Sequence, residues 1–107
     1  MRSIEFEILL TLATGERHGY AIIQDIEARS DGALSIETGT LYRAIQRLVE
    51  GDLVRPSESR RATAEFHERR RVYAITPEGR RAASAEARRM DALVHAARAA
   101  KLYPGRT

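Results

Sequence analysis

The sequence predicts a mainly α-helical fold with a small β-hairpin and a long C-terminal helix. Apolar residues recur at helical spacing in three segments before residue 51, and β-branched and aromatic residues gather at 71–75. No helix-breaking residue interrupts the last segment between Pro77 and about Leu102, apart from Gly79 in its first turn. Three helices followed by a hairpin predict a winged helix-turn-helix, and the appended helix is the usual place for such domains to dimerise.

The first helix is expected to follow Ser3, whose hydroxyl can cap it, and to end at Gly15. Glu5 and Glu7 lie in its opening turn, where the positive end of the helix dipole favours acidic side chains. Apolar residues between positions 4 and 13 cover most of its circumference. A helix of this kind is buried or shared with a second subunit.

The second helix is expected from about Tyr20 to Arg29, with Ile22, Ile23 and Ile26 on one face, before a turn at 30–32. We expect the Tyr20 ring to lie in the core with its hydroxyl in water. A contact of that hydroxyl with phosphate is the alternative.

The third helix is expected to begin at 38–40 and to reach about Glu50. Leu41, Ile45 and Leu48 form its apolar stripe, so the polar side chains opposite them face outward. Outward Arg and Gln can reach base edges, and Tyr and Thr hydroxyls can reach phosphate oxygens, whereas the alternative is a solvated helix face. The residues predicted to contact DNA here are Thr38, Gly39, Thr40, Tyr42, Arg43, Gln46 and Arg47.

The hairpin is expected to start at Leu53 and Val54, after Gly51 and Asp52 stop the third helix, and to return over 71–75. Between these strands lies a polar loop over 56–70, and loops of that length in small domains are usually functional. Its arginines are expected beside phosphates or the minor groove, although a merely soluble loop would have a similar composition. This hairpin, strands and loop together, is the predicted wing. Its predicted DNA-contacting residues are Arg60, Arg61, Arg69, Arg70 and Arg71.

The last helix has a strong start signal in Thr76, Pro77 and Glu78. Small and apolar residues then recur at steps of four and three, which is the pattern of a coiled-coil seam. The residues expected at a dimer interface are Phe6, Ala83, Ala87, Met90, Leu93, Val94 and Ala97. We therefore expect a DNA-binding unit over 1–76 and a dimerisation helix over 77–103.

Charge is distributed unevenly along the chain. Residues 1–54 hold 5 basic and 9 acidic residues, whereas residues 55–107 hold 13 and 6, so the C-terminal half is suited to an anionic partner. The chain has no cysteine, and its three histidines have no partner at helical metal-ligand spacing, so no metal or other cofactor is expected. No run reaches about 18 apolar residues and no secretory signal opens the chain, so we expect a cytoplasmic protein.

Three sequence motifs show a family resemblance. They are His18-Gly19-Tyr20-Ala21-Ile22, then Gly39-Thr40-Leu41-Tyr42-Arg43-Ala44-Ile45-Gln46-Arg47-Leu48, and Arg71-Val72-Tyr73-Ala74-Ile75-Thr76-Pro77-Glu78-Gly79. In this order they resemble the PadR family of bacterial transcriptional regulators, and the likeness extends from Ile8 to Ala97. It implies a homodimer that binds an operator in double-stranded DNA, usually as a repressor, with the third helix in the major groove and the wing on the backbone.

The sequence departs from that family pattern in two places. The wing segment 62–66 lacks a glycine-rich tip, and the chain has no tryptophan for an aromatic ligand clamp. No small-molecule effector is identified. A pocket for one would lie between the long helix and the partner's first helix, lined by Phe6, Met90, Leu93 and Val94, which ordinary interface packing explains equally well.

Catalysis is not expected, because the sequence has no nucleophile with a base, no paired carboxylates and no phosphate-binding glycine loop. Two alternatives to a DNA-binding regulator stay open. One is a winged helix used only for protein contact. The other is a small dimeric enzyme that holds a carboxylate substrate with arginines at the seam, although the arginines of the last helix mostly avoid that stripe.

Overall fold

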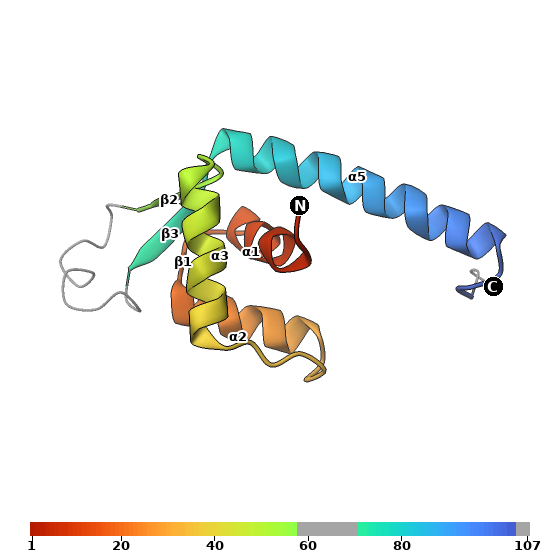
Figure 1. Ribbon diagram of the computed structural model, residues 1–107, viewed down its shortest axis with the longest axis horizontal. Coiled ribbons are helices and arrows are strands. Elements are labelled where there is room, and N and C mark those ends of the chain that lie inside the picture. The colour runs from red at the N-terminus through yellow and green to blue at the C-terminus, as the bar shows by residue number, and fades with distance from the viewer. Residues whose placement is uncertain (58–70, 105–107) are drawn as a thin grey trace.

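A computed structural model describes residues 1–57 and 71–104 of the chain (Figure 1). Its elements in chain order are α1 (Ser3–Ala13), β1 (Arg17–His18), α2 (Gly19–Arg29), α3 (Thr38–Glu50), β2 (Val54–Pro56), β3 (Val72–Ile75) and α5 (Pro77–Ala99). Three helices, a small antiparallel sheet and a long final helix confirm the predicted fold class.

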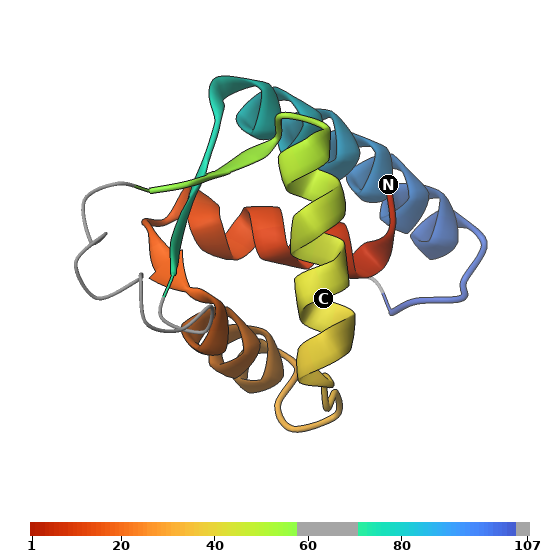
Figure 2. The same ribbon diagram turned by 60° about the vertical axis from the view of Figure 1, so that its left-hand side comes forward.

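The hydrophobic core lies where α1, α2 and α3 meet the sheet. Each helix contributes an apolar stripe at the spacing that the sequence predicts, and Tyr73 of β3 closes the core from the sheet side. The core residues are Ile8, Leu9, Leu12, Ile22, Ile23, Ile26, Leu41, Ala44, Ile45, Leu48, Val54 and Tyr73. In Figure 2, α3 lies on the surface and crosses in front of α1. One face of α3 therefore packs on the core while the other is exposed.

The sheet has three strands in the order β1-β3-β2, all antiparallel. The sequence predicted only the two wing strands, so the prediction of a simple hairpin is incomplete. Arg17 pairs with Tyr73, and Val54 pairs with Ile75. At the base of the wing, the Ser57 hydroxyl donates to the Glu16 carboxylate at 2.9 Å. β1 and the residue before it thus fix the wing to the helical body.

α1 begins one residue earlier than the capping prediction placed it. Arg2, rather than Ser3, is the N-cap, and its backbone N–H donates to the Glu5 carboxylate at 3.2 Å. Glu5 therefore satisfies an N–H at the helix start, as an acidic side chain in a first turn commonly does.

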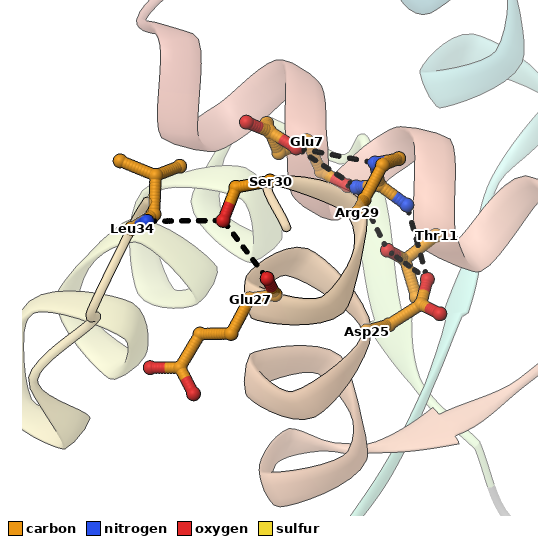
Figure 3. A network of polar contacts seen from close by, with 7 residues as sticks. All are labelled: Glu7, Thr11, Asp25, Glu27, Arg29, Ser30 and Leu34. Carbon is orange, nitrogen blue, oxygen red and sulfur yellow. Dashed lines mark hydrogen bonds and ion pairs between the residues drawn. The ribbon is translucent and has the colours of Figure 1, made fainter. Parts of the chain in front are cut away.

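A polar network joins α1 to α2 (Figure 3). The Arg29 guanidinium donates to the Glu7 carboxylate at 2.9 Å and to Asp25 at 3.1 Å. Asp25 also accepts the hydroxyl hydrogen of the buried Thr11 at 2.8 Å. These contacts satisfy a buried hydroxyl and link α1 to α2 through their side chains.

α5 begins as predicted, because the Thr76 hydroxyl accepts a hydrogen bond from the Gly79 N–H at 2.9 Å. The same hydroxyl donates to the Asp52 carbonyl, which ties the helix start to the turn before β2. The first turns of α5 pack on α1, and the rest extends beyond the body of the domain (Figure 1). Gly79 is its only fully buried residue, so most of this helix is exposed to solvent.

After three of the helices, the second residue beyond the helix end has a left-handed conformation, and none of these three residues is glycine. They are Asp31, Asp52 and Lys101, with φ between 58° and 66°. At the end of α5, Leu102 N–H donates to the Ala97 carbonyl and Lys101 N–H to that of Arg98, which is the Schellman arrangement. α5 therefore ends at Ala99 instead of about Leu102, and at the end of α3 Asp52, not Gly51, makes the reversal.

Candidate nucleic-acid interface

The outward face of α3 carries a group of polar side chains, as the sequence predicts. Thr38, Gly39, Thr40, Arg43 and Gln46 are all exposed on it. The first backbone N–H groups of the helix also lie at this end, and such groups have no partner within their own helix. This face therefore offers forked side-chain donors next to backbone donors.

The two central side chains of this face are only loosely held. Arg43 Nη2 lies 3.4 Å from Thr40 Oγ1, and Gln46 Nε2 lies 3.5 Å from Glu50 Oε2, both at the long limit of hydrogen bonding. Arg43 and Gln46 can therefore exchange these contacts for a ligand at little cost.

Tyr42 requires a correction, because its hydroxyl does not point outward. The hydroxyl oxygen is buried, and the ring lies over Gly19 at the start of α2. A Cβ on Gly19 would meet Tyr42 Cζ at 2.6 Å, so only glycine fits beneath the ring. The position of this hydroxyl contradicts the expectation that it reaches a phosphate, and Tyr42 instead joins α2 to α3.

Arg47 also differs from the prediction. Its Nε donates to Glu5 Oε2 of α1 at 2.7 Å, so the guanidinium is turned toward α1 and away from the outward face. Burial raises the pKa of the Glu5 carboxyl, but hydrogen bonds from Arg47 and from the Arg2 backbone outweigh it and hold this pKa below its usual value. The Glu5 carboxyl is therefore ionised at neutral pH.

Tyr20 was wrongly expected in the core, since its side chain is 59% exposed. The core face of α2 is occupied by Ile22, Ile23 and Ile26, and Tyr20 lies well off that face. It lines a small pocket of about 90 Å³ together with Ile23, Thr38 and Tyr42. The sequence did not reveal that Tyr20 stands beside the start of α3.

The wing is described only at its base. Arg55 and Arg71 are exposed where the two wing strands leave the sheet. Arg60, Arg61, Arg69 and Arg70 lie outside the described residues. His18, at the start of the neighbouring α2, is the N-cap residue of that helix, but its side chain makes no capping hydrogen bond there.

The residues predicted at a dimer interface occupy different surroundings. Ala83 packs against the core of its own chain. Phe6, Met90 and Ala97 are half-buried. Ala87, Leu93 and Val94 are exposed along the projecting part of α5. The structure thus leaves an apolar stripe uncovered beyond the point where α5 leaves α1.

Other kinds of site find no support in the part of the chain that the structure describes. No group of three His, Asp or Glu side chains within 1–57 and 71–104 could hold a metal ion. Over the same ranges, none of the helices has the length and apolar composition that a transmembrane segment needs.

Comparison with known proteins identifies the family. The model of the family described as "Transcriptional regulator PadR-like family" matches residues 8–85. The chain belongs to this family. The description of this family as transcriptional regulators confirms the predicted resemblance to PadR regulators.

One relative is similar over most of this chain. A Streptomyces fradiae protein, described as an uncharacterized 37.1 kDa protein in transposon TN4556, is 40% identical over 83 residues. The match covers 78% of this chain and 21% of that protein, so the chain spans about a fifth of its length.

Solved structures share the winged-helix fold of this PadR-like chain. A transcriptional regulator from Clostridium thermocellum superposes with a TM-score of 0.73 at 26% identity, covering 87% of this chain and 84% of its own. A PadR family regulator from Clostridium difficile gives 0.71 at 20% identity, with 91% and 96% covered. RosR of H. salinarum gives 0.65 at 24% identity, with 94% and 96% covered.

Proposed function

We propose that this PadR-like protein is a sequence-specific repressor that binds a palindromic operator as a homodimer. The observation that carries the proposal is the outward face of α3, where Arg43 and Gln46 stand exposed and loosely held above a fully packed apolar face. Residues 1–76 would form the DNA-binding unit and 77–103 the dimerisation helix. Because the proposed ligand is chromosomal DNA, we propose that the protein acts in the cytoplasm.

In the proposed complex α3 enters the major groove and the wing lies along the backbone. Arg43 and Gln46 read base edges, while Thr38, Gly39 and Thr40 offer hydroxyls and backbone N–H groups to a phosphate. A two-fold dimer would present two α3 helices to successive major grooves about 34 Å apart. Selection of binders from a random duplex pool tests this arrangement, because the recovered DNA should be a palindrome with that spacing.

Alanine at Arg43 or Gln46 should separate specific from non-specific binding. A bidentate base contact is worth about 1–3 kcal/mol of discrimination, so each variant is expected to weaken operator binding about tenfold or more. Binding to random duplex should stay much closer to the parent. Gel-shift or fluorescence titrations on both DNAs measure the two affinities, and equal losses on operator and random DNA would refute base reading by α3.

The wing should contribute affinity without sequence choice, because phosphate contacts position a protein on DNA but do not specify sequence. Replacing Arg69 and Arg70 together by alanine is expected to weaken binding to both operator and random DNA. It should also flatten the slope of log K against log salt by up to about one unit per lost phosphate contact. The matched control is Arg81→Ala with Arg88→Ala, which removes two exposed arginines from α5. A wing variant that kept the parental slope would show that the wing does not touch phosphate.

A further inference from the structure

The starting point is the direction of the Arg47 side chain on α3. Thr40, Arg43 and Arg47 follow one another at steps of three and four, so their backbone positions share the outward face of the helix. Arg43 is exposed there, but Arg47 donates its Nε hydrogen to Glu5 at 2.7 Å and is only 37% exposed. One of the two arginines on this face is therefore held by the protein itself.

Glu5 is well placed to hold that arginine. Its side chain is 14% exposed, and it accepts hydrogen bonds from Arg47 through Oε2 and from the Arg2 backbone through Oε1. The Arg2 guanidinium lies 4.0 Å away, at the limit of an ion pair. A carboxylate held by α1 in this way is a fixed anion at the side of the proposed DNA-binding face.

We infer that Glu5 restrains Arg47 from binding DNA phosphates and so limits binding to DNA of any sequence. The inference rests on the proposed function. An arginine one turn from Arg43 and released from its partner would be drawn to the phosphate backbone, and phosphate contacts strengthen all sites alike. With Arg47 held back, a larger share of the binding energy comes from groups that read bases.

Glu5→Gln tests this directly, because it keeps the size and the carbonyl acceptor of the side chain but removes its charge. Affinity for a random duplex is expected to rise about five- to tenfold near 0.1 M salt, and the slope of log K against log salt to steepen by about one unit. Operator affinity should rise by no more than the same factor. The ratio of operator to random affinity should therefore not increase.

A double-mutant cycle assigns the effect to Arg47. Arg47→Gln alone should leave the salt slope unchanged, because the restrained guanidinium makes no phosphate contact in the parent. In the Glu5→Gln background the same change should abolish the gain. A merely structural tie between α1 and α3 predicts the opposite pattern, in which either single change weakens binding and neither steepens the slope.

Glu86→Gln is the matched control for net charge. Its carboxylate is 13% exposed and accepts a hydrogen bond from Arg89 at 2.6 Å, but it lies on α5, away from the proposed DNA contacts. This variant should leave the slope and the random-duplex affinity at parental values. Thermal melting followed by circular dichroism establishes that each variant is folded at the temperature of the titration.

Three results would overturn the inference. The first is a folded Glu5→Gln variant with unchanged or weaker random-duplex binding, and the second is a gain that survives Arg47→Gln. The third is a flatter slope for Arg47→Gln alone, which can be measured even if Glu5→Gln fails to fold. A parent protein with no salt-dependent DNA binding would instead refute the proposed function, and the inference would fall with it.

Discussion

Gly79→Ala is expected to lower the free energy of unfolding by about 3 kcal/mol or more, the largest stability loss that the structure predicts for a single methyl group. Gly79 is buried in the first turn of α5, against the backbone of Leu53. A Cβ there would overlap the Leu53 carbonyl oxygen and would lie 2.8 Å from Ile75 Cγ1. Backbone cannot swing aside as a side chain can, so α5 would have to move off the sheet.

Chemical denaturation at a fixed protein concentration measures this loss, since subunit association would make the stability depend on concentration. Gly51→Ala is the matched control. Gly51 has a negative φ of −89°, and a Cβ there would meet nothing closer than 3.5 Å, so its stability should stay within about 0.5 kcal/mol of the parent. Equal stability of the Gly79 variant and this control would contradict the packing described for the start of α5.

The buried and exposed faces of α3 were predictable because they follow from the spacing of apolar residues within that one segment. Leu41, Ile45 and Leu48 define the buried side, and this alone places Arg43 and Gln46 outward. The Thr76 cap was predictable for the same reason, because a hydroxyl followed by proline acts on its own first turn. Local chemistry of this kind needs no knowledge of the rest of the fold.

The directions of Tyr42 and Arg47 were not predictable, since they depend on partners far earlier in the chain. Tyr42 turns over Gly19 because that glycine leaves space, and Arg47 turns to Glu5 because α1 brings a carboxylate within 2.7 Å. Helical spacing gives the position of a Cβ but not the rotamer of a long side chain. The motif His18-Gly19-Tyr20 did hold one signal, a glycine at a helix start, which indicates close packing by another element.

The third strand was missed because it is very short. A strand is recognised in a sequence by alternating apolar and polar residues, and two residues are too few to show that pattern. Arg17 and His18 form a strand only because β3 lies beside them. Similarly, Lys101 ends α5 in a left-handed conformation that its residue type does not favour. The short strand is set by tertiary packing and the left-handed Lys101 by the reversal of the chain, so the conformational propensities of these residues do not predict them.

Val94→Arg is expected to convert the proposed homodimer into a monomer and to weaken operator binding by about 100-fold or more. Leu93 and Val94 are 56% and 38% exposed in the single chain, on the part of α5 that extends beyond α1. An exposed apolar stripe at coiled-coil spacing is explained by a second copy that covers it, and an arginine in that seam would be buried without a partner. Linking two half-site contacts through one dimer raises affinity by about 100-fold or more over a single subunit, and the variant loses that gain.

Sedimentation at micromolar concentration measures the mass, and titration of the selected operator measures the affinity. The matched control is His95→Arg, which puts the same side chain on the adjacent, polar stripe of α5, beside Asp91 and Arg98. The control should sediment as the parent does and keep its operator affinity, because its charge stays in water. A dimer that persists in Val94→Arg, or a parent that is already monomeric, would refute the α5 seam as the dimer interface. Operator binding by a monomeric parent would then require that one α3 and one wing supply the whole affinity.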